Sequence, residues 1–142
     1  GRRSPIVYGW TEPYAAAGHA ITISVPGDSL RVGLDAYGTP HLVAVRWAQD
    51  PRRYEPACGA AFDPYGPVEL GFVTSMVAQA GLDALLGQMR SGTHRIWLAR
   101  RAGVEAAGGT WSDELRAIAP NALDGATIVE RRWDRSARIL AA

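Results

Sequence analysis

The sequence predicts an α/β domain in which a mixed sheet of short strands is covered by one long packed helix. Three observations lead to this fold class. The first third of the chain contains short runs of β-branched and aromatic residues separated by Gly and Pro. From residue 67 onward, apolar residues recur at three- and four-residue spacing, as in an amphipathic helix. A further apolar run then follows at residues 94–99, and a strand that returns directly after a helix is typical of crossover connections.

The expected strands of the first third are residues 6–10, 19–25, 30–35 and 42–47. Gly18, the Pro26–Asp28 turn and the Tyr37–Pro40 turn separate them, and the last three strands could form a meander. The segment Thr11–Gly18 has the least regular pattern. We therefore expect it to be a surface loop.

Residues 48–67 are rich in proline and glycine without a sustained period, and we interpret them as a long crossover loop. Pro67 is well suited to the first position of the following helix, and Glu69 suits the positive end of the helix dipole. The helix is predicted to continue toward Ser91. The residues expected to face the sheet are Val73, Met76, Val77 and Ala80.

The last third contains two further strands and a short helix. His94–Ala99 is the strand that follows the long helix, and the Gly108–Gly109 pair interrupts the chain after it. Ser112 is the expected N-cap of a helix that ends at Pro120. Alternation over Ala126–Trp133 predicts the final strand, and the type of the apolar ending is left open.

Composition limits the possible chemistry. Fifteen basic and fourteen acidic residues leave a net charge of +1, too small to favour nucleic acid or a membrane surface as a partner. All basic residues are arginine, so no lysine amine is available as a nucleophile. The single cysteine excludes an internal disulfide and a zinc site built on cysteine pairs. With no signal-peptide pattern and no membrane-length apolar run, a reducing cytoplasm is the expected compartment.

Cys58 is the candidate catalytic residue. It lies in the segment Glu-Pro-Ala-Cys-Gly, which we expect to be an exposed loop directly before the long helix, where a thiol can act as a nucleophile. The competing interpretation is a buried, inert thiol. His19, His41 and His94 are possible bases, but each is more simply a strand-end or partly buried histidine, and no base is assigned.

The polar and aromatic residues around the loop have ordinary explanations. Glu55 and Asp63 flank the cysteine, and carboxylates beside Pro and Gly most often cap turns. The five tryptophans do not have the spacing of a binding motif, so core and edge packing is the simpler interpretation.

The order of these segments resembles a known family. The series consists of a Pro-Ile-Val-Tyr-Gly-Trp strand, an Ala-Gly-His-Ala-Ile-Thr-Ile strand, the Glu-Pro-Ala-Cys-Gly loop, the Pro-Tyr-Gly step and a helix ending Leu-Asp-Ala-Leu-Leu-Gly. It is similar to the carboxyl-terminal half of the ThiF/MoeB adenylyltransferases, prokaryotic relatives of ubiquitin-activating enzymes. The resemblance assigns residues 1–112 to a partial ThiF-like, Rossmann-like domain and residues 113–142 to a helix and strand extension of it.

The resemblance implies a function in two steps. A parent enzyme would adenylate the C-terminus of a ubiquitin-like or other small protein with ATP and Mg²⁺ and then transfer the acyl group to Cys58. The family's glycine-rich phosphate turn after the first strand has no counterpart here, so the chain would be a fragment or one half of a split enzyme that binds no cofactor alone. A non-catalytic dimerisation or protein-binding domain and a cysteine hydrolase are the alternatives.

Overall fold

The computed structural model describes residues 4–23, 30–34, 36, 42–89 and 92–133. In chain order the elements are β1 (Ile6–Thr11), η1 (Pro13–Ala15), β2 (Ala17–Ile23), η2 (Leu30–Gly33), β3 (Val45–Trp47), β4 (Arg53–Tyr54), β5 (Ala61–Phe62), α1 (Pro67–Leu85), β6 (Thr93–Leu98), α2 (Arg101–Ala106), β7 (Gly109–Trp111), α3 (Asp113–Ile118), η3 (Pro120–Ala122) and β8 (Thr127–Arg132). The α/β composition is confirmed.

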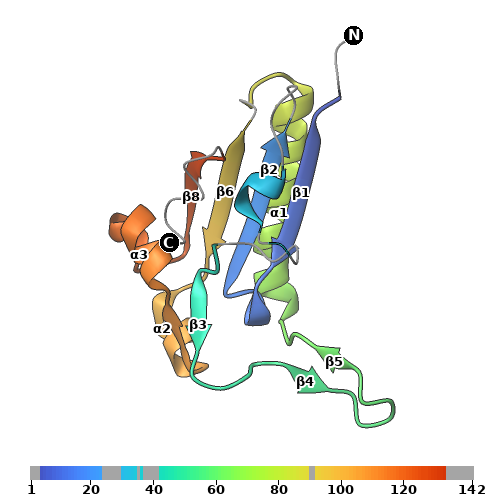
Figure 1. Cartoon of the computed structure of the whole chain (residues 1–142), viewed down its shortest axis with the longest axis vertical. Helices are drawn as coiled ribbons and strands as arrows, with labels where there is room; N and C mark the ends of the chain where they lie inside the picture. Colours follow the sequence, from blue (N-terminus) through green and yellow to red (C-terminus); the bar gives the residue numbers. More distant parts are fainter. Residues whose placement is uncertain (1–3, 24–29, 35, 37–41, 90–91, 134–142) are drawn as a thin grey trace.

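The main sheet has four strands in the order β1-β2-β6-β8 (Figure 1). All three of its pairings are antiparallel, and so are the pairings β3–β7 and β4–β5. The expectation of a mixed sheet is therefore wrong for the described residues. Because α1 leads from the hairpin β4–β5 into β6, it does not link two parallel strands as a crossover helix would.

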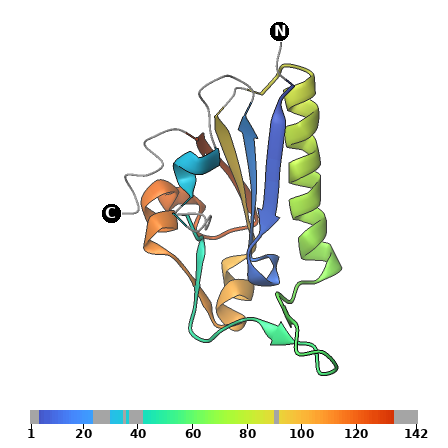
Figure 2. The same ribbon diagram turned by 45° about the vertical axis from the view of Figure 1, so that its right-hand side comes forward.

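Helix α1 covers one face of the sheet and packs close to it (Figure 2). Val73, Met76 and Ala80 are buried against the strands, as predicted, and Val77 is half-buried. The close approach depends on Gly9 in β1 and Gly18 in β2. A Cβ atom at Gly18 would overlap Val73, and one at Gly9 would lie 2.7 Å from Val77.

The opposite face of the sheet supports most of the core. Ile21, Ile96 and Leu98 are fully buried there. This face is covered by η2 and by the segments around β3, α2 and α3 (Figure 2). The N-cap of α3 is as predicted, because the Ser112 side chain accepts a hydrogen bond from the Leu115 amide at 3.0 Å.

The strand predicted at residues 30–35 is a 3₁₀-helix over Leu30–Gly33, and Asp35 lies outside the described residues. Tertiary packing explains the difference, because the Gly33 backbone lies against the Trp133 ring. Among the described residues, the predicted meander is also absent. Strand β2 already pairs with β1 on one side and β6 on the other, so no edge remains for a following strand.

The segment Thr11–Gly18 is not the predicted surface loop. Glu12 is 6% exposed, and Ala15–Gly18 are buried between the sheet and the neighbouring segments. The turn is tight enough to place Tyr14 at φ 60° and Ala15 at φ 46°, the left-handed region that non-glycine residues seldom adopt. An alanine-rich stretch is thus compatible with a buried turn.

The segment at residues 48–67 is more ordered than predicted. It contains the antiparallel hairpin β4–β5, which projects from one end of the molecule (Figure 1). The helix α2 was not predicted, whereas β6 and β8 lie close to their predicted positions. Helix α1 begins at Pro67 as predicted but ends at Leu85, short of the predicted stop near Ser91. In the described part of the chain, no helix combines the length and apolar character needed to cross a bilayer.

Candidate functional site

A cavity of about 740 Å³ opens beside the first turns of α1, the end of β6 and helix α2. Two aromatic pairs form part of its wall. Tyr14 and Trp47 have ring centroids 5.1 Å apart with the planes tilted by 45°. Phe72 and Trp97 are stacked, with centroids 4.7 Å apart and an interplanar angle of 14°. We call this cavity the aromatic pocket.

The remaining wall of the aromatic pocket is built mainly from small residues. They come from the turn before β2, the residue after β6, and helix α2 with its C-cap, and include Ala16, Ala99, Ala102, Gly103 and Ala107. Glu69 and Arg100 are its charged lining residues, and neither forms a salt bridge with another described residue. Concave sites with apolar walls and few polar groups are typical of ligand and peptide binding.

The hairpin β4–β5 adjoins this pocket through Tyr14. The Tyr14 amide donates to the Pro64 carbonyl at 2.6 Å, and Arg53 Nη2 donates to the Tyr14 hydroxyl at 3.4 Å. Three large side chains on and beside the hairpin are exposed: Tyr54 (58%), Phe62 (49%) and Tyr65 (54%). Exposed aromatic side chains therefore stand on a hairpin that is joined to the pocket wall through Tyr14.

Cys58 lies in the turn of the hairpin and is exposed, so the buried-thiol interpretation is wrong. The prediction that it directly precedes the long helix is also wrong, because β5 follows it and α1 begins only at Pro67. The neighbouring Gly59 has φ 69°, a left-handed conformation that glycine adopts readily and that allows the chain to turn there. The catalytic role of Cys58 stays a prediction.

The carboxylates near Cys58 are exposed, and the hydrogen bonds that close the turn are formed by the backbone. The Glu55 amide donates to the Ala60 carbonyl at 2.9 Å, and the Gly59 amide donates to the Glu55 carbonyl at 2.7 Å. Just before the hairpin, hydrogen bonds from the Arg52 side chain and backbone lower the pKa of Asp50 to about 2.

The two histidines of the described residues belong to a different part of the molecule. They form a buried chain of hydrogen bonds that crosses the sheet from β8 to the turn after β1, which we call the histidine network. Arg131 Nε lies 3.2 Å from His94 Nδ1, His94 Nε2 lies 3.0 Å from His19 Nδ1, and His19 Nε2 lies 2.9 Å from Glu12 Oε1. The Glu12 carboxylate also accepts the amide hydrogens of Ala44 at 2.6 Å and Val45 at 3.0 Å.

The direction of these hydrogen bonds fixes both tautomers. Arginine only donates, so His94 Nδ1 must accept and His94 carries its proton on Nε2. His94 then donates to His19, which in turn donates from Nε2 to Glu12. Both rings are neutral in this arrangement. Burial is the main reason that the pKa of His94 lies well below its usual value, and the proximity of His19 and Arg131 lowers it further.

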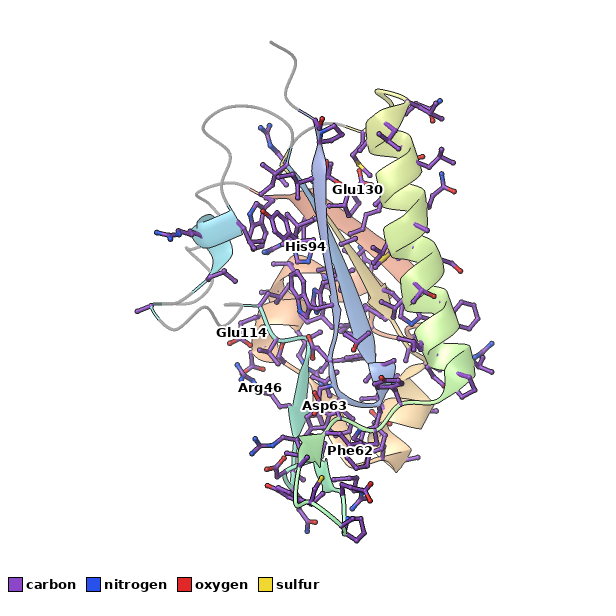
Figure 3. All side chains as sticks on the ribbon, turned by 90° about the vertical axis from the view of Figure 1, so that its right-hand side faces the viewer. Arg46, Phe62, Asp63, His94, Glu114 and Glu130 are labelled. Atoms are coloured by element: carbon purple, nitrogen blue, oxygen red, sulfur yellow. The ribbon has the colours of Figure 1, made fainter. Side chains whose placement is uncertain are left out.

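The histidine network leaves Cys58 without a basic partner among these residues. His19 and His94 are fully buried and stacked beside Trp10, whereas Figure 3 shows the hairpin residues Phe62 and Asp63 far from His94. His41, the third candidate base, lies outside the described residues. Glu12 was not singled out from the sequence. The signal that could have indicated it is a buried histidine on the adjacent strand, which requires a hydrogen-bonding partner.

Of the site residues considered from the sequence, His19 and His94 are brought together in the histidine network, whereas Cys58 lies apart from them in the turn of the hairpin. The tryptophans mostly pack in the core or on its margin, as expected, but Trp47 and Trp97 also line the aromatic pocket. Within the described ranges, no group of three His, Cys, Asp or Glu residues could hold a metal ion. Comparisons of the chain with protein-family models, with curated proteins and with solved structures give no match.

Proposed function

We propose that this chain is a protein-binding domain, in which the aromatic pocket and hairpin β4–β5 hold an apolar segment of a partner protein. The observation that carries the proposal is the presence of exposed apolar side chains both at the pocket and on the adjoining hairpin. Val68 (66% exposed) and Phe72 (52% exposed) stand at the pocket, and Tyr54, Phe62 and Tyr65 extend this surface. Large apolar side chains that are exposed together in one region are typical of protein–protein interaction sites.

The pocket favours one aromatic or large aliphatic anchor residue in the partner segment. Its two aromatic pairs present ring surfaces to such a side chain, and its volume falls in the range of ligand-binding cavities. Glu69 and Arg100 add one acidic and one basic group at the wall. The expected ligand is therefore a mixed-charge segment around an apolar anchor, because a uniformly charged segment would face one repulsive group.

Peptide selection tests this proposal, because it needs no known partner. Phage-displayed random peptides selected on the purified chain should converge on an aromatic or aliphatic anchor. Replacing Phe72 by Ala should weaken a selected peptide roughly 5- to 30-fold in calorimetry, since loss of a buried apolar contact costs about 1–2 kcal/mol.

Leu82→Ala is the matched control, since Leu82 lies on the same helix, is 50% exposed and does not line the pocket. Its peptide affinity should equal that of the unaltered chain. No enrichment of peptides, or equal weakening by both variants, would contradict the proposed binding site.

The acyl-carrier role of Cys58 is a second candidate, favoured by the exposure of its thiol at the tip of the hairpin. In a ThiF-like parent enzyme, a partner protein held at the pocket would have its activated C-terminus transferred to this sulfur. ATP and Mg²⁺ would bind to the missing half, so we expect the isolated chain to bind ATP no better than at about millimolar Kd. Of the described strands, none leads through a glycine-rich turn into a helix of a parallel βαβ unit.

Substitution of the thiol distinguishes the two candidates. In the full parent enzyme with ATP and its partner, Cys58→Ala should abolish a reductant-sensitive conjugate and leave adenylation intact. A persisting conjugate would eliminate the acyl-carrier role without affecting the binding proposal. The cysteine hydrolase gains no support, because both described histidines are held in the histidine network.

A further inference from the structure

The two edges of the main sheet differ in their protection. Strand β8, at one edge, ends in Glu130, Arg131 and Arg132, and charges on an edge strand discourage pairing with another chain. Strand β1, at the other edge, reads Ile-Val-Tyr-Gly-Trp-Thr and carries no charge. No described residue pairs with its outer side. Alternate N–H and C=O groups of β1 therefore point outward without a strand to accept them.

The side of α1 above this edge is uncharged as well. Val77 lies over Gly9 of β1, whereas Asp83 binds Arg95 of β6 at 2.8 Å, and these contacts fix the rotation of the helix. Helical periodicity then assigns five residues to the β1 side: Leu70, Thr74, Ala78, Gly81 and Leu85. Thr74, the polar member, donates its hydroxyl hydrogen to the Leu70 carbonyl within the helix. Leu85 is 77% exposed.

We propose that β1 and this side of α1 form a two-fold interface, in which a second copy of the chain pairs its own β1 antiparallel to the first. A two-fold axis places like residues near one another, so a charged surface would repel itself. The residues of β1 and of the β1 side of α1 are uncharged, so two copies of this surface do not repel one another. The two sheets would join into one continuous sheet, with both α1 helices on the same face.

The spacing of strands and helices favours a second copy over an isolated strand. Val77 contacts the position of Gly9 in β1 and Val73 that of Gly18 in β2, so the axis of α1 runs above the gap between these strands. The two-fold axis would lie half a strand spacing outside β1. With strands about 4.8 Å apart, the two helices would be separated by about 10 Å, which is the distance of directly packed helices. A second copy thus covers the strand edge and the helix side at once.

The interface would leave the aromatic pocket open. Phe72 and Trp97, which line the pocket, lie on the β6 side of α1, opposite to the proposed contact. Dimerisation and binding at the aromatic pocket are therefore independent. The inference goes beyond the proposed function and does not rest on it.

The decisive variant is Gly81→Arg, measured by sedimentation equilibrium over a concentration series. A Cβ at Gly81 meets nothing within 4 Å in the single chain, and replacing a helical glycine favours the helix. The unaltered chain should reach twice the 15.2 kDa chain mass, and the variant should stay at that mass with an equal or higher melting temperature. A loss of dimer by this variant is thus separable from unfolding.

Ser75→Arg is the control, because Ser75 is exposed on the same helix but faces away from the β1 side. It should dimerise as the unaltered chain does. Amide hydrogen exchange supplies a second readout: outward-facing β1 amides should gain protection with rising concentration, and Gly81→Arg should abolish the gain. A chain that stays monomeric at its highest soluble concentration, or a dimeric Gly81→Arg variant without concentration-dependent protection of β1, would overturn the proposal.

Discussion

The histidine network and the hairpin β4–β5 use similar residue types in opposite ways. In the network, Glu12 is buried without an arginine partner among the described residues, and three N–H groups donate to its carboxyl oxygens. In and beside the hairpin, carboxylates such as Asp50 and Glu55 stand in solvent and the turn is closed by backbone bonds. The difference shows that a titratable residue indicates a functional site only when its burial is considered as well. The histidines serve structure, and the exposed hairpin is free to contact a partner.

The largest difference in unfolding free energy is expected between alanine variants of Glu12 and Glu55. Glu12→Ala leaves the His19 ring N–H and the amides of Ala44 and Val45 buried without an acceptor, which should cost about 3–5 kcal/mol of unfolding free energy. Glu55→Ala in the hairpin should change it by less than about 0.5 kcal/mol. Urea unfolding of both variants measures the contrast. Equal effects would show that the network does not stabilise the fold.

As the pH falls, the contribution of the histidine network to stability should decline before that of the region beside the hairpin. The unfolded chain protonates His94 near pH 6.5, but the folded chain resists because burial and its neighbours lower that pKa. The contribution of His94 to stability is therefore complete above pH 6.5. It should decline as the pH falls below 6.5, by at most about 1.4 kcal/mol per pH unit, until the folded pKa is reached.

Unfolding midpoints in urea between pH 7.5 and 5 would show this decline. The pKa of Asp50, beside the hairpin, is lowered from its ordinary value of 3.8 to about 2. Its contribution to stability is therefore complete above pH 3.8 and does not change between pH 7.5 and 5. A stability that is flat between pH 6.5 and 5 would mean that the histidine pair accepts a proton in the folded state without loss. His94→Gln, if folded, should show a shallower pH dependence than the unaltered chain.

The smallest effect is expected at the tip of the hairpin. Cys58→Ser should change the free energy of unfolding by about 0.5 kcal/mol or less, as neutral surface substitutions do, because the side chain is exposed. Iodoacetamide should label Cys58 fully in the native protein without denaturant. A thiol that reacts only after urea is added would place the hairpin tip in a contact that the single chain does not show.

The elements with strong local patterns were predictable, and their assembly was not. The three- and four-residue spacing of Val73, Met76 and Ala80 identified α1 and its buried face. Ser112 identified the start of α3 because N-capping is a local interaction. Strand direction depends on how the chain returns to the sheet, and no residue in β2 or β6 encodes that their pairing is antiparallel.

The candidate site was predictable only in part for the same reason. The loop around Cys58 could be recognised because proline and glycine mark turns locally, but the strands β4 and β5 of the hairpin were not predicted. The aromatic pocket is built from segments as distant as Tyr14, Phe72 and Trp97, so its existence depends on tertiary structure. At Leu30–Gly33 the β propensity of the sequence was overridden by the packing of Gly33 against Trp133.

The close seating of α1 also constrains how the sequence can change over evolutionary time. Val73 occupies the space that a side chain at position 18 would need, and Val77 occupies the space that a side chain at position 9 would need. The combined volume of each pair is therefore fixed by the packing. A larger residue in the strand would be accepted only where the facing helix position became smaller at the same time. When related sequences are collected, positions 18 and 73 should therefore change together, as should positions 9 and 77.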